Sequence, residues 1–439
     1  MRPARRFLSL WILILLAAGP ARAAVVPLLE IEGPIGPVAA EYVEEALAEV
    51  DPVATPAVIL RIDTPGGLDA SMRRIVRAVL RSPVPVVAWV GPSGARAASA
   101  GLFVVAAAHV AAMAPGTNLG AAHPVALGGG GGEDDTLARK AEEDAAAYLR
   151  SLARQRGRDP AWFEEAVRES RSLAAEEALE QGVVDLLAAS PEELLGKLEG
   201  RKVPFGTAEI ELRVAGARVR PVPMGLRHRA LRVLSDPNVA YLLLLLGFYG
   251  LFFELSNPGA IFPGVLGGLC LILAFVGLQT LPFHYGGVLL ILLGLVLLLL
   301  EVKITSFGLL TVGGVVCLVL GSLMLFRSSE AYYRVSWTVL VPAVAGTVAF
   351  FAFAVGKGLA AQKARRLGGS EGLVGERGRV VEPPGPDRPG RVFVHGEYWN
   401  ARCPDPVEPG AEVEVVSVEG LTLTVRPVPR GSAGEQGSA

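Results

Sequence analysis

The sequence predicts three structural classes in one chain: an α/β globular domain, an all-α domain that crosses a membrane several times, and a small all-β barrel. Three observations lead to this prediction. Strand-like and helix-like patterns alternate over residues 24–200, and apolar stretches long enough to span a bilayer fill residues 237–356. Short strand patterns separated by turns rich in Pro and Gly then follow over 372–428.

The composition favours a membrane protein and excludes several other classes. The 439 residues are 51% hydrophobic and 19% charged, whereas ordinary soluble domains carry roughly 25% charged residues. Lysine and arginine (41) nearly balance aspartate and glutamate (43), so the net charge of −2 gives no indication of nucleic-acid binding. Three cysteines are too few for a disulfide scaffold, and no metal or other cofactor is expected.

Residues 1–23 have the pattern of a secretory signal peptide. A basic start precedes an apolar stretch over 7–18 and an A-x-A site at 21–23. The apolar stretch is too short to rank first as a spanning helix, and an uncleaved anchor is the alternative. In both cases the segment that follows is expected outside the cytoplasm.

Residues 24–200 have the order of a mainly parallel sheet covered by helices. Two turns follow predicted strands, at 63–67 (Asp-Thr-Pro-Gly-Gly) and at 91–101, a segment rich in Gly and Ala. In such sheets the chemistry lies at the carboxyl ends of the strands, so these turns are the candidate site. The expected strands cover 25–31, 57–62, 85–90 and residues near Val110, and the expected helices cover 38–50, 71–80, a segment from Ser99, and 140–156.

Ser99 is the candidate nucleophile, and Ser93 is its rival. Ser99 begins a predicted helix among small residues, which leaves room for a substrate carbonyl, although the same position suits a helix N-cap. Backbone amides of the Gly66–Gly67 turn are placed to stabilise an oxyanion.

The candidate base follows from the rarity of lysine. The chain contains six lysines and 35 arginines. A serine hydroxyl needs a base at neutral pH, and arginine cannot lose its proton, whereas a desolvated lysine can. Lys140 is the one lysine before Lys197, and it follows a glycine-rich, acidic loop over 128–135. A solvated helix charge is the alternative role for Lys140, and His123 is the alternative base.

Five apolar stretches are expected to cross the bilayer within residues 237–356, a segment of 120 residues that contains six charged ones. The first is the weakest, so a four-span or re-entrant arrangement stays open. Glu254 is a candidate for helix pairing, whereas Glu301 and Lys303 are expected at the interface. The stretches lie near 239–255, 261–280, 284–301, 306–326 and 336–356.

The orientation follows from an outside start and five crossings, which place the C-terminus in the cytoplasm. Basic residues over 357–366 agree with this orientation, whereas three arginines over 227–232 disagree with it. Residues 201–236 and 357–371 are expected to be linkers.

The pattern over 372–428 is typical of a small β-barrel, and residues 429–439 are expected to be a disordered tail. Acidic residues are interspersed through the barrel and few aromatics, such as Tyr398 and Trp399, are present. This composition favours a protein-interaction or membrane-proximal module over a nucleic-acid-binding one.

The order of these motifs resembles the long form of the membrane-bound NfeD family, over nearly the whole chain. It implies a ClpP/crotonase-like fold for the first domain and an OB fold for the barrel. The motifs are 63–67, 94–101 (Gly-Ala-Arg-Ala-Ala-Ser-Ala-Gly), 114–120 (Ala-Pro-Gly-Thr-Asn-Leu-Gly), Lys140, 148–153 and 173–185.

The resemblance assigns the nucleophile to Ser99 and the general base to Lys140, 41 residues later. It places the oxyanion donors at Gly67, together with Gly66, and at the amide of Ala100. A Ser-His-Asp triad that uses His123, as in ClpP itself, is the competing arrangement.

The resulting hypothesis is a membrane-anchored serine endopeptidase that cleaves apolar segments of membrane-associated proteins. The resemblance implies a stomatin-like (SPFH-domain) partner, and a homo-oligomer, a dimer or higher, is expected. The chain is expected to be a multi-pass protein of the cell membrane, with the peptidase domain outside and the barrel in the cytoplasm. The alternatives are a non-catalytic scaffold that assembles with stomatin-like proteins, and a crotonase-type acyl-CoA enzyme, which export from the cytoplasm argues against.

Overall fold

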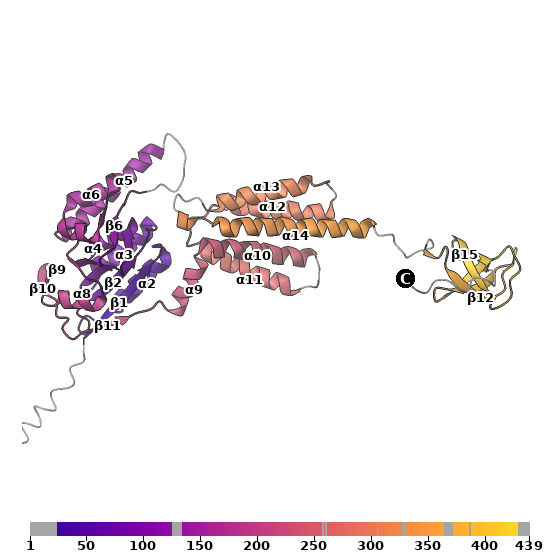
Figure 1. Cartoon of the computed structure of the whole chain (residues 1–439), viewed down its shortest axis with the longest axis horizontal. Helices are drawn as coiled ribbons and strands as arrows, with labels where there is room; N and C mark the ends of the chain where they lie inside the picture. The colour runs from indigo at the N-terminus through magenta and orange to yellow at the C-terminus, as the bar shows by residue number, and fades with distance from the viewer. Residues whose placement is uncertain are drawn as a thin grey trace, which may run out of the picture. The chain divides into compact units, whose positions relative to one another are not determined.

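A computed structural model describes residues 24–124, 134–256, 259, 261–304, 306–326, 331–363, 372–385 and 388–428. The predicted signal peptide, the glycine run before Lys140 and the predicted tail lie outside the described residues. Figure 1 shows an α/β domain, a group of apolar helices and a small β-barrel. The chain divides into two compact units, 1–348 and 349–439.

A six-stranded sheet forms the centre of the α/β domain, in the order β11-β1-β2-β3-β5-β8, and all its neighbouring strands are parallel. Every residue of β3 is buried, as expected for a strand covered on both faces. The predicted parallel sheet is therefore confirmed. The strands are β1 (Val25–Glu32), β2 (Val58–Asp63), β3 (Val86–Val90), β5 (Val110–Met113), β8 (Leu186–Leu187) and β11 (Arg218–Pro221).

Four helices of this domain, α2 to α5, match predicted ones, although α5 begins six residues before Lys140, and α6, α7 and α8 were not predicted. α3 buries Met72, Ile75, Val76 and Val79, which share one face at helical spacing. α4 is buried at every position, as an apolar core helix must be. The helices are α2 (Pro37–Ala48), α3 (Asp69–Arg81), α4 (Ala100–Ala107), α5 (Asp134–Gln155), α6 (Pro160–Arg168), α7 (Ala175–Glu180) and α8 (Pro191–Leu198).

A second, three-stranded sheet was not predicted. It consists of β4 (Arg96–Ala98), β6 (Asn118–Gly120) and β7 (Ser172–Ala174), in the order β4-β6-β7. β4 and β6 are parallel, and β4 leads directly into Ser99. This small sheet therefore positions the candidate nucleophile.

The expectation that residues 201–236 are a linker is wrong. They contain a hairpin of β9 (Lys202–Phe205) and β10 (Ala208–Glu211), the edge strand β11, and α9 (Leu226–Leu234). β11 pairs with β1, and Val203 of β9 is buried in the core beneath the sheet. The two arginines of β11 resemble a polar linker in the sequence, but an edge strand tolerates charged side chains.

Five apolar helices match the five predicted stretches. The length and composition of α10 and α11 allow both helices to cross a membrane. The described apolar parts of the other three helices, over 285–301, 309–325 and 337–353, are shorter. Glycines let neighbouring helices approach closely: a Cβ on Gly250 would meet the Gly267 Cα at 2.7 Å. The helices are α10 (Pro237–Ser256), α11 (Ile261–Leu278), α12 (Tyr285–Lys303), α13 (Leu309–Leu325) and α14 (Trp337–Lys363).

The glutamates of these helices serve structural roles. The Glu254 carboxylate occupies the space beside Gly264 on α11, in agreement with a role in helix pairing. Glu301 is buried and accepts hydrogen bonds from the amides of Gly308 (3.1 Å) and Thr311 (3.2 Å), so it caps the start of α13. The side chain of Lys303 is outside the described part.

The C-terminal domain is a closed five-stranded barrel, as the predicted OB fold requires. Apolar residues such as Val392, Val394 and Val425 fill its centre. The strands follow the order β12-β13-β14-β16-β15, with β12 (Arg377–Glu382), β13 (Gly390–Val394), β14 (Glu397–Arg402), β15 (Glu412–Glu419) and β16 (Thr422–Pro427).

His109 is a buried structural residue and gives a pH prediction. It is 7% exposed, and its Nδ1 accepts a hydrogen bond from the Val86 amide at 3.1 Å. Burial, with the nearby charges of Arg156 and Arg158, lowers the pKa of His109 from 6.5 to about 3. In the unfolded chain the ring takes up a proton below about pH 6.5. The stability that the neutral, buried His109 ring contributes is therefore complete above that pH and is lost as the pH falls toward 3.

We expect His109→Asn, which keeps an acceptor, to weaken this pH dependence. The melting temperature, followed by scanning fluorimetry, should change less between pH 6.5 and 4 than in the wild type. His123→Asn, at an exposed histidine, is the control. The same slope in wild type and His109→Asn would contradict the assignment.

Candidate functional site

Ser99 occupies a strained turn between β4 and α4. Its φ of 49° and ψ of −114° lie in a region that favours glycine, at a cost of about 1–3 kcal/mol. Its hydroxyl makes no capping hydrogen bond to α4, so the N-cap role does not account for the serine. Ser99 is partly buried, and a serine on a sharp, strained strand-to-helix turn resembles the arrangement of a nucleophile elbow.

The segment 114–120 holds this turn in place. The Ser99 amide donates hydrogen bonds to the carbonyls of Gly120 (3.1 Å) and Ala121 (3.2 Å). Gly120 has a φ of +130°, and a Cβ there would meet the Arg171 carbonyl oxygen at 2.4 Å, so only glycine fits. The motif therefore fixes the backbone of Ser99 in its strained conformation.

The turn after β2 is held from two sides. The buried hydroxyl of Thr64 donates to the Gly66 carbonyl (3.0 Å) and accepts from the Gly66 amide (3.1 Å). On the other side, the Ile35 amide donates to the Gly66 carbonyl (2.8 Å), and the Leu68 amide donates to the Ile35 carbonyl (2.9 Å). A Cβ on Gly67 would lie 2.2 Å from the Ile35 oxygen, which explains the second glycine.

The two predicted turns meet. A Cβ on Gly66 would lie 2.8 Å from Ser99 Cβ and 3.3 Å from Ser99 Oγ. Within the described part of the chain, the amides of Gly67 and Ala100 donate to no protein acceptor. The Gly66 amide is engaged by Thr64, so the structure differs from the sequence expectation for that donor.

Lys140 lies in the first half of α5 and is exposed. Ser99 and Lys140 are both described and do not hydrogen-bond to each other. Leu137, one turn before Lys140, is also 62% exposed, whereas Leu149 and Leu152 farther along α5 are buried. The structure therefore places the predicted base on an uncovered helix turn, without a hydrogen bond to the predicted nucleophile.

The two rivals occupy different surroundings. His123 is exposed, and its Nδ1 donates to the Val167 carbonyl at 3.1 Å. In a triad that N–H would be held by a carboxylate. Ser93 is exposed in the turn before β4, where its Oγ would lie 2.8 Å from a Cβ on Gly116, and it does not begin a helix.

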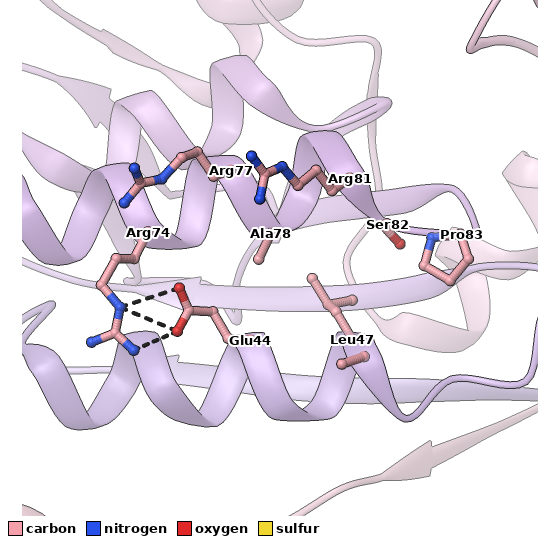
Figure 2. A pocket seen from close by; sticks show the side chains of 9 residues that line it. Glu44, Leu47, Arg74, Arg77, Ala78, Arg81, Ser82 and Pro83 are labelled. Atoms are coloured by element: carbon pink, nitrogen blue, oxygen red, sulfur yellow. Dashed lines mark hydrogen bonds and ion pairs between the residues drawn. The ribbon is translucent and has the colours of Figure 1, made fainter.

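A cavity of about 510 Å³ lies between α2 and α3, and none of the predicted site residues lines it. Figure 2 shows the Arg74 guanidinium directed at the Glu44 carboxylate across this cavity, with Arg77 and Arg81 farther along α3. The hydrogen bond to Glu44 raises the pKa of Arg74 above its ordinary value. The ion pair between Arg74 and Glu44 therefore links α3 to α2.

One described group resembles a metal site in composition. The ligand atoms of Glu41, Glu45 and His228 all lie within 4.8 Å of one another. Arg227 already pairs with Glu41 (2.7 Å) and Glu45 (3.5 Å), so an ion pair between α2 and α9 accounts for the carboxylates.

The sequence analysis missed Tyr332, which lies beside the Ser99 turn. Its hydroxyl would be 3.3 Å from a Cβ on Gly66, although it is 266 residues later in the chain. A tyrosine pair between two apolar stretches is a sequence signal for a membrane interface. Its position beside Gly66 depends on the tertiary structure.

Three family models match consecutive parts of the chain. The NfeD1b N-terminal domain matches residues 25–201, and the NfeD integral membrane domain matches 238–356. The NfeD-like C-terminal, partner-binding domain matches 370–427.

Known proteins match over most of the chain or over its first domain. The membrane-bound protease PH1510 of Pyrococcus horikoshii is 33% identical over 431 residues, 96% of this chain and 97% of that protein. Membrane protein NfeD1b of Bacillus subtilis is 27% identical over 408 residues, 89% and 90% of the two chains. A solved structure, the 1510-N membrane protease specific for a stomatin homolog from Pyrococcus horikoshii, has a TM-score of 0.42 and 30% identity, and covers 48% of this chain and 98% of that one. The match to PH1510 over nearly the full length of both proteins shows that the chain belongs to the NfeD family of membrane proteins.

Proposed function

We propose that the chain is a membrane-anchored serine endopeptidase with Ser99 as nucleophile and Lys140 as general base. The observation that carries this proposal is the strained backbone of Ser99 beside the amides of Gly67 and Ala100, which donate to no acceptor in the described part of the chain. A helix start does not need such strain, whereas a serine that must face a substrate carbonyl does.

The positions of Ser99, Gly67 and Ala100 support the attack and oxyanion steps of an acyl transfer, which we propose proceeds as follows. Ser99 Oγ attacks the carbonyl carbon of the scissile peptide bond and gives its proton to Lys140. The amides of Gly67 and Ala100 donate to the oxyanion as it forms. Lys140 then protonates the departing amine, and a water molecule, activated by the same lysine, releases the acyl group from Ser99.

Lys140 needs to approach Ser99 for this chemistry. The uncovered turn of α5 that carries Leu137 and Lys140 offers an apolar side chain to an apolar substrate. A substrate that covers this turn removes water from Lys140, and desolvation favours the neutral amine that a base requires. We therefore propose that substrate binding completes the dyad.

The relatives suggest the substrate class and the partner. PH1510 is described as a membrane-bound protease, and the solved 1510-N domain as specific for a stomatin homolog. The family model of the barrel is described as partner-binding. We propose that this chain cleaves apolar segments of a stomatin-like partner, with the peptidase domain outside the cytoplasm, the barrel inside and the chain in a homo-oligomer.

A non-catalytic scaffold is the second candidate function. The observation that favours it is the exposed Lys140, which makes no hydrogen bond to Ser99. A scaffold requires no chemistry at Ser99, so one substitution separates the two functions.

Ser99→Ala tests the proposal. We expect the full chain, reconstituted in lipid nanodiscs, to cleave fluorogenic apolar peptides, and Ser99→Ala to lose at least about 10⁴-fold in kcat, as removal of a serine nucleophile does in other peptidases. Ser93→Ala serves as the matched control and should keep wild-type activity. Equal turnover by wild type and Ser99→Ala would remove the peptidase assignment, and binding of a stomatin-like protein by both variants would then favour the scaffold.

A further inference from the structure

Two tyrosines of the membrane domain lie beside the Ser99 turn. They belong to η1 (Ala331–Tyr333), between α13 and α14, and their rings meet edge to face with centroids 4.8 Å apart. Both line a cavity of about 250 Å³ together with Pro34 and Gly36, which follow β1. The membrane domain therefore contributes to the surroundings of the candidate site.

Tyr333 holds the segment that clamps the Gly66–Gly67 turn. It is 5% exposed, and its hydroxyl donates to the Ile35 carbonyl at 3.5 Å. The same carbonyl accepts from the Leu68 amide, and the Ile35 amide donates to Gly66. Tyr333 thus reaches the oxyanion turn through one intervening residue.

Tyr332 lies next to the nucleophile. Its hydroxyl and Ser99 Oγ are each 3.3 Å from the same point, the position of a Cβ on Gly66. The two oxygens are therefore no farther apart than about 7 Å, which is the span of two extended residues. A side chain within about two residues of a scissile carbonyl at Ser99 can therefore reach the Tyr332 hydroxyl.

The tyrosine pair also lies where a membrane helix begins. α14 starts at Trp337, and the Ser336 amide just before it donates to Asn238 Oδ1 in the first turn of α10 (2.8 Å). Tyrosines are enriched at such membrane–water interfaces because the ring is apolar and the hydroxyl is polar. Tyr332, which lies beside the Ser99 turn, therefore belongs to the membrane domain.

We infer that Tyr332 is a specificity-determining residue, which accepts an apolar side chain of a substrate segment at the bilayer surface within two residues of the scissile bond. Tyr333 is the positioning residue, because its ring packs against Tyr332 and its hydroxyl donates to the Ile35 carbonyl. This inference rests on the proposed peptidase function and names the part of the site that selects apolar substrate.

The experiment compares substrate preference in full-length variants in lipid nanodiscs. The probes are fluorogenic peptides from one apolar sequence, with Leu, Phe or Ala at each of two positions on both sides of the cleaved bond. Tyr332→Ala should change the preference for Leu over Ala, as kcat/KM, by about tenfold or more at one position, and Tyr332→Phe should retain it. Tyr285→Ala is the matched control, because Tyr285 is another tyrosine near the start of an apolar helix, α12, and is 73% exposed.

The outcomes separate the inference from the proposed function. An unchanged preference in Tyr332→Ala, or an equal loss for every peptide, would overturn the inference, because a purely structural tyrosine affects all substrates alike. Only the inference fails if the wild type cleaves the peptides, Ser99→Ala does not cleave them, and Tyr332→Ala keeps the wild-type preference. If wild type cleaves none of the peptides, the proposed function and the inference both fail.

Discussion

Lys140→Arg is expected to lower kcat/KM for apolar peptides by about 10²–10⁴-fold, the usual contribution of a general base. The substitution keeps the positive charge and most of the length of the side chain. It removes the ability to lose a proton, because the guanidinium stays protonated in proteins. Steady-state kinetics of the reconstituted full chain measure the loss.

Two further variants control this prediction. Lys197→Arg makes the same change at α8, where Lys197 pairs with Glu193 at 2.7 Å, and should leave kcat/KM unchanged. His123→Ala should retain most of the activity. Wild-type activity in Lys140→Arg combined with loss in His123→Ala would replace the dyad with a Ser-His arrangement.

Gly66→Ala is expected to reduce kcat by about 10²–10³-fold, the loss seen when an oxyanion donor is removed. The φ of +127° at Gly66 is unfavourable for alanine, and the new methyl group would lie 2.8 Å from Ser99 Cβ. The turn must shift to relieve this contact, and the Gly67 amide shifts with it. Kinetics and the melting temperature of the same preparation separate lost chemistry from lost folding.

Gly94→Ala is the matched control for backbone strain. Gly94 has a φ of +90° in the neighbouring turn, and a Cβ there meets nothing within 4 Å. We expect both variants to lose stability from backbone strain, Gly66→Ala more because of its added contact, whereas only Gly66→Ala loses activity. Similar activities in both variants would show that Gly66 does not shape the site.

The sheet and its helices were predictable because their patterns are local. β3 is a short, wholly apolar segment, which is typical of a strand buried on both faces. α3 has its apolar residues at helical spacing, so its buried face can be read from the sequence. The meeting of the Gly66 and Ser99 turns also follows from general topology, since both come after parallel strands of one domain.

Two features that the sequence did not predict, β11 and the position of Tyr332, depend on contacts between distant residues, whereas a third is local. β11 pairs with β1 across almost 200 residues, and its arginines conceal an edge strand. The Gly66 amide was expected to face an oxyanion, but Thr64, two residues away, engages it. Tyr332 reaches Gly66 only through the packing of the membrane domain, which no local pattern encodes.

The nucleophile is the central claim, and the residue that carries the acyl group during turnover identifies it. The full chain is incubated with an apolar peptide ester, quenched in acid, digested and mapped by mass spectrometry. We predict that the acyl mass is found on Ser99 in the wild type and is absent from Ser99→Ala, which releases no alcohol above the background rate. Turnover of the ester with the acyl group on Ser93 or on any other residue would contradict the assignment of Ser99.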